Sequence, residues 1–158
     1  MRTFNKGLYI LPALFLLLVP AVQATAAQTA TGTFTTTATT ISVTVINGNT
    51  LITQSLTINA MGDISGSLTG SDVAVITSTG SGFLAGIGTF SGTILGRAGT
   101  VGIGFAGTFS PTTGQLNLQA NFLRGTGTGQ LAGISGTGTI QGIFNVGGTY
   151  TFSVTFQS

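Results

Sequence analysis

Glycine recurs at short intervals along the chain from Gly62 to Gly148, and this spacing most constrains how the chain can fold. A glycine inside a helix costs about 1 kcal/mol relative to alanine, so this stretch cannot form a stable helix. No segment after Gln28 places apolar residues at helical spacing. The pattern that does repeat has a period of two, which is the side-chain period of a β-strand. The sequence therefore predicts an all-β protein.

The alternation predicts which aromatic side chains are buried. Apolar residues take every second position in several segments, and threonine, serine, asparagine or glutamine stand between them. We expect four phenylalanines to be buried, namely Phe105, Phe122, Phe152 and Phe156. We expect Gln119, Asn121 and Thr155 to face outwards. Between residues 83 and 94 the apolar positions change from odd (Phe83, Ala85, Ile87) to even (Phe90, Ile94), which predicts a bulge or a sharp bend.

Turn residues, such as the pair Asn47-Gly48, divide the chain into eight predicted strands. These cover residues 31–46, 50–60, 64–77, 83–95, 99–110, 114–124, 132–144 and 147–157. Eight antiparallel strands with short turns predict an up-and-down barrel, with a β-sandwich as the alternative. Side chains fill the interior of such a barrel, or it holds one small ligand. A membrane-embedded barrel has the same strand count, but the Thr, Ser and Gly face lacks the charges of its usual polar lumen, so we do not favour it.

Residues 1–27 have the features of a secretory signal peptide. Arg2 and Lys6 precede an apolar run over residues 7–19, and the small residues Ala24-Thr25-Ala26 suit cleavage. The apolar run is shorter than the roughly 20 residues that span a bilayer. We therefore expect a secreted, periplasmic or extracellular protein, with residues 28–158 as one barrel domain.

Without this leader, two arginines (Arg97, Arg124) balance two aspartates (Asp63, Asp72). Two arginines cannot neutralise a row of phosphates, so nucleic acid is not an expected partner. Zero net charge leaves little repulsion against self-association. The chain also has no Cys and no His, which excludes the common zinc and haem ligand sets and the Ser-His-Asp triad. We expect no metal and no cofactor.

The two aspartates are the remaining candidates for acid–base chemistry. Each follows a glycine-containing pair, and aspartate in turns commonly bonds its own backbone, so we interpret both as turn residues. No catalytic residue is assigned on this basis. No side chain of the mature chain ordinarily titrates between about pH 5 and 8, so ligand binding should not vary with pH there. Arg97 is expected to be a turn residue paired with an aspartate or a carbonyl, rather than an anion site.

Four segments together resemble a bacterial family of unknown function. They are Phe90-Ser91-Gly92, Gly96-Arg97-Ala98-Gly99, Gly107-Thr108-Phe109 and residues 125–134. The resemblance implies a calycin-like barrel similar to that of plant allene oxide cyclase, and no established activity. Relatives often carry a Glu-Arg pair and a histidine at the positions of Gly88, Thr89 and Phe105, and a glutamate at that of Gln130. The ionisable groups of the relatives are therefore missing from this chain.

These observations favour a secreted, non-enzymatic barrel that binds a small apolar ligand. The expected ligand-lining residues are Phe90, Phe105, Phe122, Arg124, Tyr150 and Phe152. One alternative is an isomerase or cyclase of the allene oxide cyclase type, which would depend on positioning its substrate. Another is a structural, matrix or ice- and surface-binding protein that uses alternating threonines, such as Thr33, Thr35, Thr37 and Thr39, or Thr149, Thr151 and Thr155. The glycine-rich stretch 125–129 lacks the following helix and lysine of a phosphate-binding loop, so we expect a plain connection there.

Overall fold

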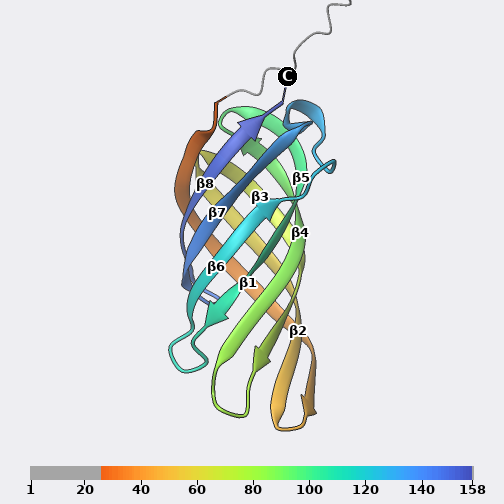
Figure 1. Ribbon diagram of the computed structural model, residues 1–158, viewed down its shortest axis with the longest axis vertical. Coiled ribbons are helices and arrows are strands. Elements are labelled where there is room, and N and C mark those ends of the chain that lie inside the picture. Colours follow the sequence, from red (N-terminus) through yellow and green to blue (C-terminus); the bar gives the residue numbers. More distant parts are fainter. Residues whose placement is uncertain (1–25, 158) are drawn as a thin grey trace, which may run out of the picture.

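Eight antiparallel strands close into one barrel in the computed structural model, which describes residues 26–157 (Figure 1). The strands are β1 (Gln28–Ile46), β2 (Asn49–Gly62), β3 (Ile64–Ile76), β4 (Gly82–Ile94), β5 (Arg97–Phe109), β6 (Gln115–Phe122), β7 (Ile134–Ile143) and β8 (Gly147–Phe156). Each strand pairs with its neighbours in chain order, and β8 closes the barrel against β1. The all-β, up-and-down barrel predicted from the alternation is confirmed.

The described part of the chain contains one short helical turn, η1 (Gly129–Leu131), between β6 and β7. Within residues 26–157 no helix has the length and hydrophobicity needed to cross a bilayer. The expected signal peptide, residues 1–27, lies outside the described residues except for its last two.

The inner face of the barrel is apolar and the outer face is rich in hydroxyl and amide groups. The four phenylalanines expected to be buried are all buried: Phe105, Phe122, Phe152 and Phe156. Gln119 and Asn121 are exposed as predicted, and Thr155 is half-buried. The alternation thus predicted correctly which residues of β6 and β8 face inwards. A slip of one residue would have exchanged the inner and outer faces.

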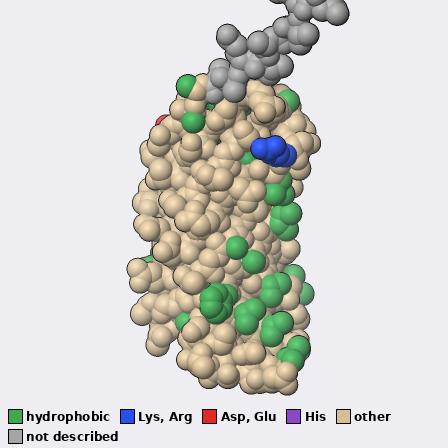
Figure 2. All heavy atoms as spheres, in the orientation of Figure 1, with side chains coloured by type: hydrophobic (Ala, Val, Ile, Leu, Met, Phe, Trp, Pro, Cys, Tyr) green, Lys and Arg blue, Asp and Glu red, His purple; other side chains and the backbone are tan. Residues whose placement is uncertain are grey.

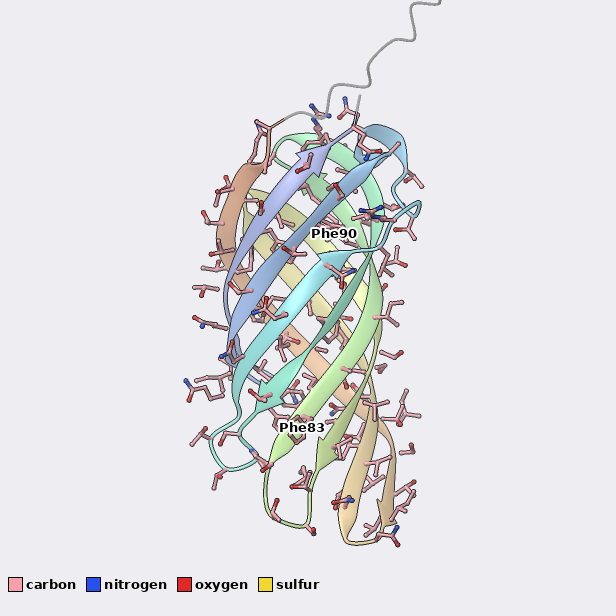
Figure 3. The ribbon with its side chains drawn as sticks, in the orientation of Figure 1. Phe83 and Phe90 are labelled. Atoms are coloured by element: carbon pink, nitrogen blue, oxygen red, sulfur yellow. The ribbon has the colours of Figure 1, made fainter. Side chains whose placement is uncertain are left out.

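The predicted bulge in β4 is wrong. β4 pairs with β3 and β5 in unbroken register, and its even-numbered residues face inwards throughout. Phe90 is therefore 1% exposed inside the barrel, whereas Phe83 is 49% exposed on its outer surface (Figure 3). The irregularity lies in β1 instead, where the register against β2 shifts between Thr40 and Ser42.

The two ends of the barrel differ. The upper end carries both ends of the described chain, and the β6–β7 connection, residues 123–133, lies beside β5 there, with Leu131 fully buried (Figure 1). This connection lies along β5: Thr128 N–H donates to the Thr100 carbonyl (2.9 Å), and Ala98 N–H donates to Gln130 Oε1 (3.0 Å). Residues 125–129 are thus a connection that continues the barrel wall along β5 where β6 has ended.

The lower end is uneven, because the β1–β2 hairpin extends past the opposite wall. β8 pairs with β1 only as far as Thr35, so residues 37–46 of β1 continue beyond it. The hairpin turns at Asn47-Gly48, whose φ angles of 50° and 77° suit a tight two-residue turn. Val43 and Val45 belong to the inner face of this hairpin, yet both are exposed where the opposite wall has ended.

Candidate functional site

Two small cavities lie inside the barrel, one above the other. The upper cavity has a volume of about 50 Å³ and is lined by Phe34, Ile58, Ala60, Ile64, Leu68, Phe90, Ile103, Phe105, Ile140, Tyr150 and Phe152. The lower cavity has a volume of about 30 Å³, and Asp72 is the one ionisable group among its lining residues. Phe34, Ile58, Phe105 and Ile140 line both cavities and so separate them. The interior is therefore mostly filled by side chains, with limited free space close to a carboxyl group.

Four of the six expected lining residues line the upper cavity: Phe90, Phe105, Tyr150 and Phe152. Phe122 is buried nearby, with its ring centroid 5.2 Å from that of Phe152, but it does not line either cavity.

Arg124, which parity predicts on the inner face or at the rim of the barrel, lines neither cavity. β6 ends at Phe122 and the chain turns at Arg124, so the alternation stops before this residue and its side chain is exposed.

Asp72 also differs from its prediction as a turn residue. It lies in the middle of β3 and is 5% exposed, with Gln54 of β2 as its register partner and also 5% exposed. Leu68 and Ala74 share its parity and are buried, so strict alternation along β3 was the signal that could have found it. The pair of Gln54 and Asp72 is the polar feature of an otherwise apolar inner face.

Both residues of this pair carry a buried oxygen without a hydrogen-bond donor, Gln54 Oε1 and Asp72 Oδ1. Buried polar atoms in proteins are normally paired, and an unpaired one requires an explanation. Burial disfavours the charged form and raises the pKa of Asp72 from 3.8 to about 6. A donor for Asp72 Oδ1 can be the Gln54 amide nitrogen after a half-turn of that amide, a proton on Asp72 itself, or a donor group from a bound molecule.

Gly86 of β4 lies between Asp72 and the ring of Phe105. The register aligns Asp72 with Gly86 of β4, and Gly86 with Phe105 of β5. A Cβ on Gly86 would collide with the Phe105 ring and approach the Asp72 Cβ, so glycine lets the ring and the carboxyl group come together. A molecule bound at Asp72 would therefore meet an aromatic surface on one side.

A polar route leads from the lower end to Asp72. Thr40 of β1 is the register partner of Gln54, and Gln54 is the partner of Asp72, so the three residues lie side by side on the inner face. Thr40 is exposed, because β1 here extends beyond β8. Ala38 and Thr36 are half-buried on the same strand and line the lower cavity. The row Thr40–Gln54–Asp72 thus runs across the inner face from an exposed hydroxyl to the buried carboxyl group.

Tyr150 has a structural role at the upper end. Its hydroxyl accepts a hydrogen bond from Ile64 N–H (2.8 Å) and lies within donating distance of the Ile64 carbonyl (2.9 Å) and the Met61 carbonyl (3.1 Å). Burial is the main cause that raises the pKa of this phenol. Since its hydroxyl is engaged with the β2–β3 connection, Tyr150 contributes its ring to the upper cavity.

The exposed charged groups of the described chain all lie at the upper end. Asp63 accepts hydrogen bonds from Thr31 N–H and Oγ1 there, at 2.9 Å and 3.3 Å. The Arg97 guanidinium lies 4.0 Å above the centroid of the Phe156 ring. Arg97 was expected to pair with an aspartate or a carbonyl, and this cation–π contact replaces that expectation.

The outer surface carries the threonine arrays and a wide groove. β1 and β8 are neighbours, so Thr33 lies beside Thr149 and Thr31 beside Thr151 on the outer face. A shallow groove of about 890 Å³ follows the lower parts of β5 to β8 and includes Gln115, Asn117 and Gln141. No charged group lines this groove, and Phe109, Leu116 and Ile143 add apolar surface beside its amides and hydroxyls.

The fold and the interior define a small closed β-barrel with a largely filled apolar lumen and one buried carboxyl group. The sequence model of DUF3224, a family of proteins of unknown function, matches residues 30–154. The chain therefore belongs to this family. A crystal structure of a DUF3224 protein of unknown function from Shewanella oneidensis MR-1 is similar, with a TM-score of 0.72 and 26% sequence identity. The similarity covers 84% of this chain and 98% of that one. No curated protein matches the chain.

Proposed function

We propose that the protein is a secreted binding protein that takes up a small, mainly apolar molecule carrying one hydrogen-bond donor. The observation that carries the proposal is the presence on register partners of two buried oxygens, Gln54 Oε1 and Asp72 Oδ1, which lack donors inside an apolar lumen. A hydroxyl or amine of the ligand would supply the missing donor, and Phe105 and the aliphatic wall would contact its apolar part. The row from Thr40 to Asp72 provides the way in.

The size of the ligand follows from the free space. Cavities of about 30 and 50 Å³ are far smaller than the roughly 300 Å³ and more of drug-sized sites. A molecule of a few heavy atoms suits this lumen, and a larger one would have to displace side chains at the lower end. A single water molecule also fits the lower cavity and is the competing occupant.

The test compares n-butanol with its isomer methyl propyl ether, which has the same atoms but no donor. Binding is followed through amide chemical shifts of the protein recovered after expression of the full chain. A hydrogen bond to a charged group contributes about 1.5–3 kcal/mol, so the alcohol should bind about 10- to 100-fold more tightly at neutral pH. This preference should weaken below about pH 6, where Asp72 becomes protonated.

Two variants locate the site. Asp72→Ala removes the anchor and should abolish the preference for the alcohol. Ala38→Leu fills the lower cavity and should weaken both probes, whereas Thr37→Leu, on the adjacent exposed residue, should change neither. Equal affinity for alcohol and ether would show that Asp72 is no anchor. Absence of binding by either probe would leave a filled barrel with water at Asp72.

A second candidate function, isomerisation of a bound substrate, is supported by the pKa of Asp72 near 6. A group with such a pKa can remove a proton from one carbon and return it to another at neutral pH, with no change in overall composition. A small β,γ-unsaturated ketone is a suitable probe. Its conversion to the conjugated ketone, lost in Asp72→Asn, would favour this function over binding alone.

A further inference from the structure

Exposed apolar side chains gather on the outer face of β3, β4 and β5 in the lower half of the barrel (Figure 2). We call this surface the β3–β5 patch; it consists of Val73, Val75, Phe83, Ala85, Ile87 and Ala106. The register makes the patch continuous, since Val75 lies beside Phe83 and Val73 beside Ala85. Polar residues of the flanking strands border it, including Thr53 of β2 and Gln119 of β6. An apolar centre with a polar rim is the composition of protein–protein interfaces.

A projection and a hollow lie next to each other on this patch. The Phe83 side chain is on the outside of β4, near its lower end (Figure 3). Its ring forms one side of an open hollow of about 370 Å³, whose other lining residues include Val73, Ala85, Ala106 and Gly107. The small side chains of β4 and β5 create this hollow. A surface that carries both a ring and a recess for a ring can complement itself across a twofold axis.

The distribution of charge favours contact between identical surfaces. Asp63, Arg97 and Arg124 lie at the upper end, and Asp72 is inside the barrel. The lower half of the described chain therefore presents no charged side chain on its surface. Two copies brought together through this half meet no like-charge repulsion.

A lipid surface fits this end of the molecule less well. A barrel that enters a bilayer with its end does so through the tips of its connections. Three of the four tips are polar or small: Asn47-Gly48, residues 78–80 and residues 112–113. The fourth, the β7–β8 connection, exposes Val146, and Ile46 is exposed beside the β1–β2 turn. The apolar side chains of the β3–β5 patch lie along the strands instead, as they do in sheets that pack face to face.

We propose that two copies of the chain associate through the β3–β5 patch, with Phe83 of each copy in the hollow of the other. The twofold axis passes close to Ala85, and β4 of one copy faces β4 of its partner. This contact is on the outer surface of the barrel and does not depend on the ligand proposed for the lumen.

Sedimentation velocity over a wide concentration range tests the proposal on the protein recovered after expression of the full chain. The unmodified protein should form a dimer. Phe83→Ser removes the central ring and should raise the dissociation constant about 30-fold or more, as loss of an interface hot spot does. Ala85→Glu places like charges across the axis and should also dissociate the dimer, with partial recovery at high salt. Thr151→Glu adds the same charge on the exposed face of β8 and should leave the dimer intact.

Other results would overturn the proposal. A protein that stays monomeric at all concentrations has no such interface, and one that is monomeric but floats with phosphatidylcholine vesicles uses the patch for lipid. The free edge of β1 is the alternative contact between copies, and Val43→Lys blocks it. A dimer that resists Phe83→Ser and Ala85→Glu but dissociates in Val43→Lys would assign association to that edge.

Discussion

Replacing Asp72 with asparagine removes the one buried carboxyl group of the described chain and preserves its shape. The wild-type carboxyl group is held among apolar side chains, and Oδ1 has no hydrogen-bond donor. Burial raises its pKa from 3.8 to about 6. The folded protein therefore binds a proton at this site more tightly than the unfolded chain does.

The size and sign of the effect follow from this shift. A pKa that rises from 3.8 to about 6 on folding corresponds to about 3 kcal/mol of folding free energy. Because the folded-state pKa is the higher one, this stability is fully present below about pH 4. It is lost as the pH rises from about 4 to about 6, where the folded protein releases the proton. Above pH 6 the charged, unpaired carboxylate stays in the barrel and the loss is complete.

Urea denaturation at several pH values between about 4 and 7.5 measures this loss. The wild type should lose about 3 kcal/mol of its free energy of unfolding across this range, and Asp72→Asn should lack that component. The asparagine amide also supplies a donor that can reach Gln54 Oε1, so the variant should be the more stable protein at pH 7.5. Asp63→Asn, the control, should retain the loss. A wild-type stability that does not change with pH, or a loss that survives in Asp72→Asn, would refute the reasoning.

Three further predictions concern the core, the upper end and the N-terminus. Phe122→Ala should lower the free energy of unfolding by about 3–5 kcal/mol in chemical denaturation, since the ring is buried against Phe152. Phe83→Ala, on the outer surface, should lower it by under about 1 kcal/mol. Similar losses in the two variants would mean that Phe122 has little packing to lose. Tyr150→Phe should cost about 1–3 kcal/mol, because the buried Ile64 N–H loses its acceptor, and an unchanged stability would show that water replaces the hydroxyl. Intact-mass measurement of the exported protein should show cleavage near Ala26 or Ala27, and retention of Arg2 and Lys6 in the main species would contradict the proposed signal peptide.

The alternation predicted the barrel because most strands have one apolar and one polar face. β4 departs from this rule on both faces. Its inner face carries Gly86 and Gly88, and a Cβ at either would collide with a side chain from a neighbouring strand, Phe105 or Leu68. Its outer face carries Phe83 and Ile87, which are exposed. Hydrophobicity alone therefore predicted the wrong face of the first half of β4 to point inwards. The side chains that fill the space beside its inner glycines come from adjacent strands.

The candidate site shows the same limit of sequence reasoning. Aromatic lining residues such as Phe105 and Phe152 followed from parity, because the apolar residues around them alternate regularly along β5 and β8. Asp72 has the inward parity of β3, but carboxyl groups are rarely buried, and the nearby Gly70-Ser71 favoured a turn. Its register partner Gln54 became significant only once the pairing of β2 with β3 placed the two residues opposite each other, each with an unpaired buried oxygen. The predicted orientation of Arg124 depended on where β6 ends, and alternation does not determine the end of a strand.

The carboxyl carbon resonances of the protein provide the most direct test of the proposed site. The chain has two acidic side chains in all, Asp63 and Asp72, so a ¹³C titration contains few signals and Asp63→Asn assigns them. The signal of Asp72 should titrate near pH 6 in the free protein, and its midpoint should fall when saturating n-butanol donates a hydrogen bond to the carboxylate. Methyl propyl ether should not lower it. A midpoint near 4 in the free protein, or one that n-butanol leaves unchanged, would contradict the assignment of Asp72 as the unpaired anchor of the lumen.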